Sequence, residues 1–260
     1  AGFLYFTLGI VSGPLSDRLG PRPVVAFGVV LIALGLFSSS FAGELWQVYL
    51  GYGAAFGMGI GFAYVPSVGV LQRWFMRRRG LATGLAVTGI GVGTLAVPPV
   101  CRFLVATMGW RATFQVLAAV VLVLGLVAAW MLYSDPGEMG LYADGEETPP
   151  AAGTALMGTS LRRAMFSAPF LLLYSGTVLL SLGFFVPFVH LAKFSVDQGH
   201  AQSWAILLIS LIGVGSMSGR LLLGGVADRM GRHRAMIAMF LGLALMQAWW
   251  YLSTAYWALA

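Results

Sequence analysis

The sequence predicts an all-α membrane protein built from two related, pseudo-symmetric helical bundles. Apolar residues make up 59% of the chain and charged residues 9%, against about half and about a quarter in soluble domains. The uncharged windows 23–43 and 45–72 exceed the roughly 20 apolar residues that span a bilayer as a helix, and 249–260 is a third, shorter uncharged window. A charged hairpin between such windows occurs twice, and this repetition predicts two related bundles.

The two hairpins are Gly13–Arg22 and Gly224–Arg232. Each reads Gly, three residues, Asp, Arg, one residue, Gly, and then a basic residue within two positions. Each also lies where one long apolar stretch ends and the next begins. A duplicated hairpin of this kind is typical of secondary transporters, which hold their substrate between the two halves.

Apolar stretches and polar breaks divide the chain into eight expected spans. Residues 1–133 are predicted to form a first bundle, 134–163 a polar inter-bundle linker, and 164–260 a second bundle. Both ends of the sequence lie in apolar stretches, so we expect further helices before and after it. The expected spans cover about 1–15, 23–41, 45–71, 81–106, 112–132, 169–192, 203–223 and the second hairpin to 252.

Basic residues lie mainly on one side of these spans. Eleven arginines fall in loops that alternate to one side, and only Arg102, Arg111 and Lys193 fall on the other. The positive-inside rule places the hairpins and the linker in the cytoplasm of a multi-pass protein of the cell inner (plasma) membrane. The net charge of +6 therefore predicts loops beside a lipid bilayer, and we expect no nucleic-acid partner.

The sequence contains no residue pattern typical of a catalytic or metal site. The single Cys101 supports neither a disulfide nor a metal site, and no nucleophile, base and orienting group fall together. We therefore expect no enzyme activity and no cofactor.

Five segments resemble those of a known family. Gly13–Arg22 and Gly224–Arg232 resemble the paired signatures of the major facilitator superfamily, which implies that about eight of twelve helices are visible, namely two to nine and the start of ten. The junction Arg73–Ala86 is similar to that of the monocarboxylate transporter group, which shares it with oxalate/formate antiporters. Gly109–Phe114 and Asp135–Leu141 also resemble bacterial members.

The hairpin charges are candidates for a gate. A carboxylate at a helix end can pair with arginines or cap a facing helix, and such contacts can close one side of a transporter. The alternative is that the acids only shape a tight turn. The predicted gating residues are Asp17, Arg18, Arg22, Asp228, Arg229 and Arg232.

Arg220 is the candidate substrate-binding residue. It lies eight residues before Asp228, about 12 Å along a helix and so near the middle of the bilayer. A charge at this depth is costly unless it meets water, a counter-ion or substrate, and a guanidinium binds a carboxylate through two parallel hydrogen bonds. The alternative is pairing with an acid in a helix outside this sequence. The resemblance implies a substrate-binding arginine at this position. It also implies that many animal members have an Asp where this chain has Ser216. Proton coupling through an Asp–Arg pair at 216 and 220 is therefore in question.

Two further side chains are weaker candidates. Tyr64 lies one turn after Gly61 and could offer its hydroxyl to substrate, or it could simply pack. His190, near the outer end of its span, could take part in proton handling or simply be solvated. We also expect glycine faces, Gly53, Gly57 and Gly61 in one span and Gly89 with Gly93 in the next, to allow close helix crossings.

The sequence thus predicts a secondary active transporter that moves a small organic anion by alternating access. Its driving partner would be a coupled proton or an exchanged counter-anion. One alternative is efflux of amphipathic compounds. Another, from a different class, is a non-transporting membrane sensor or assembly subunit, against which the duplicated hairpins argue.

Overall fold

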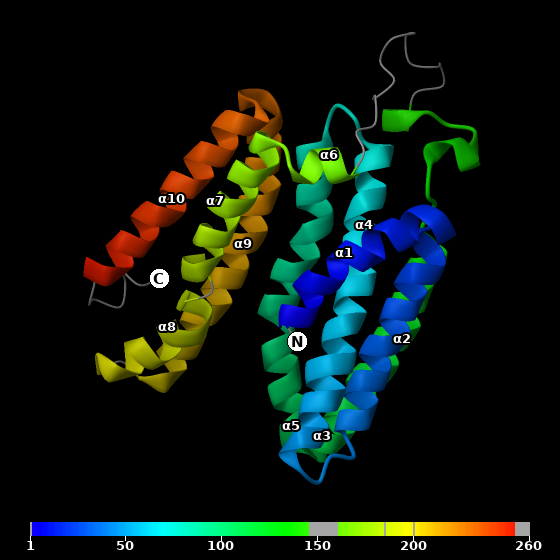
Figure 1. Ribbon diagram of the computed structural model, residues 1–260. Coiled ribbons are helices and arrows are strands. Elements are labelled where there is room, and N and C mark those ends of the chain that lie inside the picture. Colours follow the sequence, from blue (N-terminus) through cyan, green and yellow to red (C-terminus); the bar gives the residue numbers. More distant parts are fainter. Residues whose placement is uncertain (1, 146–160, 185, 200, 253–260) are drawn as a thin grey trace. The chain divides into compact units, whose positions relative to one another are not determined.

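Helices account for all regular secondary structure in the described part of the chain. The computed structural model describes residues 2–145, 161–184, 186–199 and 201–252 (Figure 1). Five helical segments there are long and apolar enough to cross a membrane, which confirms the predicted all-α membrane fold. The elements are α1 (Gly2–Leu19), α2 (Pro21–Ser39), α3 (Leu45–Val48), the π-helix η1 (Tyr49–Phe56), α4 (Gly57–Trp74), α5 (Arg79–Trp130), the 3-10 helices η2 (Pro136–Met139) and η3 (Ala143–Gly145), α6 (Leu161–Met165), α7 (Ala168–Phe184), α8 (Val186–Asp197), α9 (Gln202–Met230) and α10 (Arg232–Leu252).

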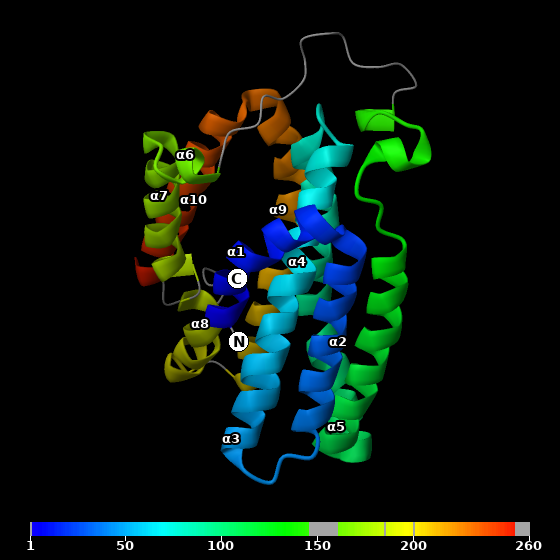
Figure 2. The same ribbon diagram turned by 45° about the vertical axis from the view of Figure 1, so that its right-hand side comes forward.

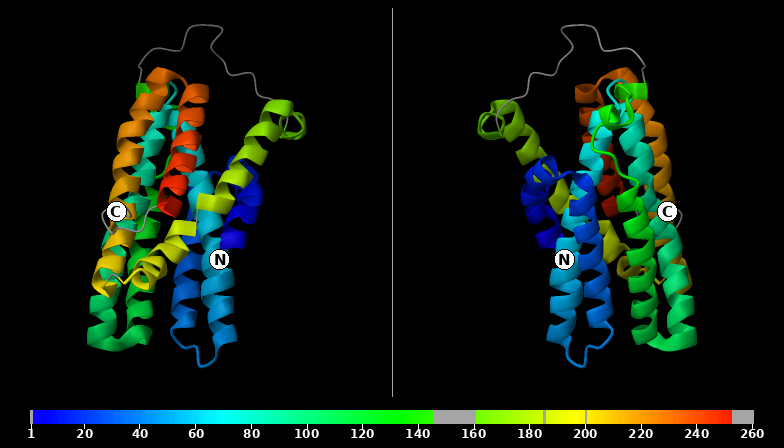
Figure 3. Two further views of the ribbon diagram at one scale, coloured as in Figure 1. Left: turned by 90° about the vertical axis from the view of Figure 1, so that its left-hand side faces the viewer. Right: turned by 90° about the vertical axis from the view of Figure 1, so that its right-hand side faces the viewer.

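The two predicted hairpins share one backbone geometry. α1 and α2 are joined by Gly20 alone, with φ 85°, and α9 and α10 by Gly231 alone, with φ 86°. The N–H of Gly20 donates to the Ser16 carbonyl at 2.9 Å, and the N–H of Gly231 donates to the Ala227 carbonyl at 3.1 Å. Residues with a Cβ rarely adopt positive φ, so the last glycine of each motif ends one helix and turns the chain into the next (Figure 3).

A third glycine divides α5. Gly109 has φ 80° and ψ 166° inside the stretch Arg79–Trp130, and the two parts of α5 run in opposite directions (Figure 1). The side chain of Thr113 donates to the Gly109 carbonyl at 2.8 Å, which satisfies one backbone group at the turn. The two spans predicted at 81–106 and 112–132 are therefore confirmed as the two parts of one helical hairpin.

The chain groups into two compact units. The first comprises Ala1–Ala86 and Ala96–Pro149, and the second comprises Val87–Leu95 and Pro150–Ala260. The boundaries of the predicted linker, 134–163, stay a prediction because residues 146–160 lie outside the described part of the structure.

Glycine backbones bring α2 and α4 together in the first unit (Figure 2). A Cβ added to Gly28 would lie 2.6 Å from the backbone N of Ala63 and 2.7 Å from the Gly59 carbonyl oxygen. Gly35 meets Gly51 in the same way, with 2.7 Å to its carbonyl oxygen. Close backbone approach of this kind is typical of helices that pack in lipid, and Val25, Val29 and Ala129 form a small buried core beside it.

The predicted glycine faces are only partly correct. Gly61 does approach a neighbour, since a Cβ there would lie 3.0 Å from the Tyr5 carbonyl oxygen, whereas one on Gly53 would meet only its own helix. Gly89 and Gly93 have open space around them. In the second unit Gly91 is the closely packed glycine instead, with its Cβ position 3.0 Å from the backbone N of Met217. The glycine spacing therefore predicts a close crossing correctly at Gly61. In α5 the glycine that packs closely is Gly91, on a different helix face from Gly89 and Gly93.

The span predicted at 45–71 contains a π-helix that the sequence did not suggest. Tyr49–Phe56 has the wider π-helical winding between α3 and α4. Gly51 lies within it, and a Cβ on Gly51 would overlap the Ser39 hydroxyl oxygen. The π-helical stretch therefore lies at a very close contact with α2.

Candidate substrate and gating sites

Arg220 occupies the middle of the apolar segment Ser210–Met230 of α9. Its side chain is half-buried, and its guanidinium donates to the hydroxyl of Ser216, one turn earlier on the same helix. Within the described residues no carboxylate lies within ion-pair distance of Arg220. The structure therefore places a permanent positive charge halfway along a span, with a neutral partner on its own helix.

Tyr64 packs against another tyrosine. Its ring meets that of Tyr5 in α1 edge to face, with 5.7 Å between the ring centroids. Tyr64 is half-buried in α4, in the first unit, whereas Arg220 lies in the second. This ring contact supports the alternative that Tyr64 packs against α1. A substrate-binding role for Tyr64 stays a prediction.

Asp17 pairs with an arginine of a different loop. The Asp17 carboxylate in α1 accepts a charge-assisted hydrogen bond from Arg73 at the end of α4. Both side chains are accessible, with exposed fractions of 65% for Asp17 and 38% for Arg73. Asp17 thus links two helices of the first unit, as one expects if it pairs with neighbouring arginines beyond its own turn.

Arg22 has a local role that the sequence did not suggest. Its Nε donates to the Leu132 carbonyl just beyond α5, and its guanidinium lies 4.3 Å from the centre of the Tyr133 ring. The indole N–H of Trp74 donates to the Tyr133 carbonyl at 3.0 Å. Arg22 and Trp74 therefore hold the segment that directly follows α5 through its backbone carbonyls.

The remaining gating candidates are less well defined. Arg18 is exposed at the end of α1, and Arg229 is exposed at the end of α9. Asp228 is half-buried and has partners. The side chain of Arg232 lies outside the described part of the structure. The gating role of these residues stays a prediction.

His190 is exposed in α8. Among the described residues no group of three or more His, Cys, Asp or Glu side chains has an arrangement that could hold a metal ion. The exposed position of His190 does not test its proton-handling role, which stays a prediction.

Asp144 is a linker residue that sequence reasoning missed. Its carboxylate accepts the backbone N–H of Met76 at 3.1 Å and that of Arg77 at 3.1 Å. Asp144 has φ 64°, the left-handed region that is uncommon for residues other than glycine. The start of the predicted linker is thereby fixed to the loop between α4 and α5, beside Arg73. No signal at the sequence level connects positions so far apart.

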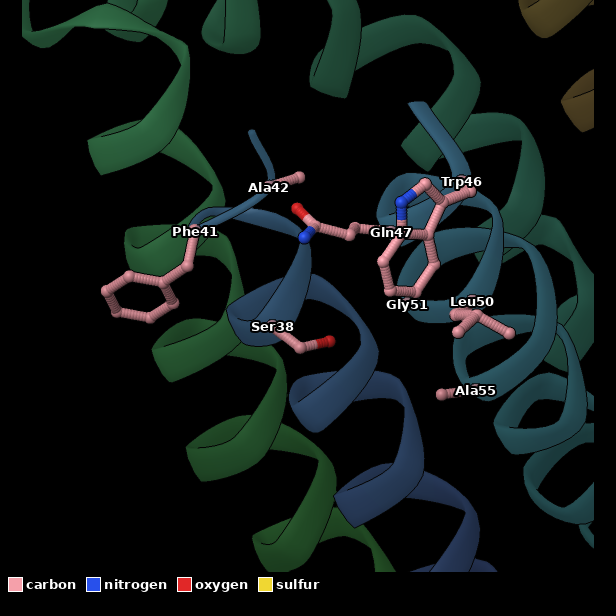
Figure 4. A pocket seen from close by; sticks show the side chains of 8 residues that line it. All are labelled: Ser38, Phe41, Ala42, Trp46, Gln47, Leu50, Gly51 and Ala55. Carbon is pink, nitrogen blue, oxygen red and sulfur yellow. The ribbon is translucent and has the colours of Figure 1, made fainter. Parts of the chain in front are cut away.

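A cavity of about 380 Å³ lies in the first unit at the α2–α3 end (Figure 4). Its polar side chains are those of Ser38, Trp46 and Gln47, and Figure 4 shows the Gln47 amide lying close to Ala42. Gln47 Oε1 already accepts the Gly43 N–H at 2.7 Å. No arginine or lysine lines the cavity, so it offers an organic anion no charge partner. Its lining residues are Ser38, Phe41, Ala42, Trp46, Gln47, Leu50, Gly51 and Ala55.

Comparison with known proteins identifies the family. The family model described as Major Facilitator Superfamily matches residues 1–260. The chain belongs to the major facilitator superfamily. This membership confirms the resemblance inferred from the two hairpins and, with the apolar helices, makes the chain a multi-pass membrane protein of a transporter family.

Relatives of this chain include monocarboxylate transporters and an efflux protein. The chain is 39% identical to monocarboxylate transporter 11 of Mus musculus, covering 84% of the chain and 47% of that protein. It is 35% identical to monocarboxylate transporter 13 of Bos taurus, covering 84% and 48%. It is also 29% identical to an agnestins efflux protein of Paecilomyces divaricatus, covering 93% and 53%. The chain thus spans about half the length of these relatives.

Proposed function

We propose that this superfamily member is a secondary active transporter that moves a small organic anion by alternating access, and that Arg220 binds the anion's carboxylate. The observation that carries the proposal is the mid-span position of Arg220 without a carboxylate partner among the described residues. A guanidinium keeps its charge in a desolvated site and binds a carboxylate through two N–H groups. The names of the monocarboxylate transporter relatives support this substrate class.

Ser216 bears on how transport is driven. A serine hydroxyl accepts from Arg220 without neutralising it, so the guanidinium remains available to an anionic substrate. Coupling would then use a proton carried at another site, with His190 as one candidate, or an exchanged counter-anion. Neither mode requires a carboxylate at position 216.

The hairpin side is proposed to be the cytoplasmic side of an inner (plasma) membrane. The arginine excess on that side supports this orientation. Asp17 and Asp228, at corresponding positions of the two hairpins, are proposed to stabilise the state that is closed on that side. The pair of Asp17 with Arg73 supports the gate by fixing the end of α1 to α4.

A second candidate is efflux of amphipathic compounds. The similarity to an agnestins efflux protein favours it. In that case Arg220 would serve packing or pair with an acid elsewhere in the full-length protein, and its removal would leave transport largely intact. A non-transporting sensor or assembly subunit would show no substrate flux at all.

Anion uptake by the full-length protein with Arg220→Ala and Arg220→Lys separates these functions. We expect Arg220→Ala to abolish uptake of lactate-sized carboxylates, because losing a charge-assisted contact in a desolvated site costs about 2–5 kcal/mol. Arg220→Lys keeps the charge but loses the planar fork and should bind more weakly. Arg234→Ala, which removes an exposed arginine at the start of α10, is the matched control. Wild-type carboxylate affinity in Arg220→Ala would overturn the proposal.

A further inference from the structure

The cavity at the α2–α3 end of the first unit lies at the depth of a bilayer surface. α2 begins at Pro21 beside the first hairpin, and Ser38, which lines the cavity, lies about 26 Å further along the helix. The hydrocarbon core of a bilayer is about 30 Å thick, so this end of α2 lies near the surface opposite the hairpins. Trp46 and Tyr49 are exposed at this end, and Trp and Tyr are enriched at membrane interfaces.

The inside of the cavity is uncharged and mainly apolar. Its volume of about 380 Å³ falls within the roughly 300–1,000 Å³ typical of small-molecule sites. Leu50, Gly51 and Ala55 line it from the π-helix η1 (Figure 4), and π-helical turns are rare and frequent at functional sites. Gln47 Oε1 accepts the Gly43 N–H, whereas Gln47 Nε2 makes no hydrogen bond to a described residue. The cavity therefore suits an apolar chain that carries a hydrogen-bond acceptor, such as a fatty-acyl ester.

Two charges of opposite sign border the cavity without lining it. Arg111 donates to the carbonyl of the lining residue Ala42 at 3.0 Å, and its guanidinium lies 4.3 Å from the centre of the Trp110 ring. Glu44 follows Ala42 by two positions and accepts the indole N–H of Trp46 at 2.6 Å. Neither Arg111 nor Glu44 forms an ion pair with a described residue. A guanidinium and a carboxylate beside one cavity complement a headgroup that carries both a phosphate and an ammonium group.

We propose that this cavity binds a zwitterionic glycerophospholipid of the bilayer leaflet opposite the hairpins. One acyl chain fills the cavity beside η1, and the Gln47 amide donates to its ester carbonyl. The phosphate pairs with Arg111, and the ammonium group pairs with Glu44. The site lies within the first unit, so it depends neither on Arg220 nor on the transport function proposed above.

Native mass spectrometry of the full-length protein tests the headgroup contacts. The probes are phosphatidylethanolamine and phosphatidylglycerol with the same acyl chains, supplied in equal amounts. We expect the wild type to retain about two- to fivefold more of the ethanolamine lipid, the size of effect that an exposed ion pair produces. Glu44→Gln should abolish this preference, because only the ethanolamine headgroup carries an ammonium group. Glu138→Gln, which changes an exposed acid in η2, is the matched control. Equal retention of both lipids by the wild type, or an unchanged preference in Glu44→Gln, would overturn the headgroup assignment.

Filling the cavity tests the position of the acyl chain. Ala55→Leu places a larger side chain in the cavity, so the total retained lipid should fall by about tenfold or more. Ala128→Leu, at an exposed position in α5, is the control, and melting temperatures in detergent show that each variant folds. Gln47→Glu keeps the acceptor for the Gly43 N–H but removes the donor, and it should lower retention about fivefold. Wild-type retention in folded Ala55→Leu would overturn the cavity as the site. If Ala55→Leu does not fold, Gln47→Glu decides, and wild-type retention in that variant overturns the proposal.

Discussion

Asp17 in α1 and Arg73 in α4 form an ion pair across 56 positions of sequence. The pair joins the first charged hairpin to the arginine cluster that follows α4. Exposed ion pairs contribute little to stability, typically 0–1 kcal/mol. We therefore expect the contact to contribute little to the stability of the fold.

Asp17→Asn should slow substrate flux while leaving expression and melting temperature within the wild-type range. Cysteine-accessibility labelling should then show greater access from the hairpin side. The charge swap D17R/R73D should recover part of the flux because it restores the pair in reverse. Unchanged labelling together with wild-type flux would leave Asp17 with a turn-shaping role only.

Arg22 is expected to affect stability more than flux. Arg22→Ala removes both the hydrogen bond to Leu132 and the stacking on Tyr133, which together are worth about 1–3 kcal/mol. Thermal unfolding in detergent measures the loss. Arg22→Lys should recover little of it, because the ammonium has no planar face. A normal melting temperature with strongly reduced flux would instead support the gating role predicted from the sequence.

Asp144 should control the amides of the α4–α5 loop. Asp144→Ala removes the acceptor of the Met76 and Arg77 N–H groups, so hydrogen exchange at both amides should rise by about tenfold or more. Asp144→Asn should have a smaller effect, because asparagine tolerates positive φ and keeps one oxygen acceptor. Asp135→Ala, which removes a cap on Gly137 only, is the control. Equal exchange in all three variants would contradict the assignment.

Gly28→Ala should destabilise the first unit. The new methyl group would lie 2.6 Å from the Ala63 backbone N, and overpacking of this kind costs about 1–3 kcal/mol. Gly69→Ala on α4 is the comparison, since nothing lies within 4 Å of its Cβ position and alanine is a better helix former. Melting temperatures in detergent should fall for Gly28→Ala and hold or rise for Gly69→Ala. The reverse order would refute the close crossing.

Ser216→Asp should weaken anion binding at neutral pH. An aspartate one turn before Arg220 is placed to form an ion pair with it and compete with a substrate carboxylate. Ser216→Ala removes only the hydroxyl and should retain most of the affinity. Equilibrium binding of a labelled carboxylate distinguishes the two variants. Equal affinity in both would mean that substrate binds elsewhere.

Short-range features of this fold could be predicted from the sequence. The turns at Gly20 and Gly231 follow from a local motif, and the mid-span depth of Arg220 follows from helical rise alone. Contacts between distant positions could not be predicted. The bond from Arg22 to Leu132 joins residues 110 positions apart, and that from Met76 to Asp144 joins residues 68 apart. Choosing between Gly89 and Gly91 as the packed glycine likewise required knowing which face of α5 meets α9.

One-residue junctions at Gly20, Gly109 and Gly231 restrict how the bundles can deform. With only one residue between them, two successive helices have no slack with which to slide past each other along their axes. Sliding of one helix along the next is therefore restricted at these three junctions. Longer connections, such as 40–44 and 75–78, leave neighbouring helices more room to shift along their axes.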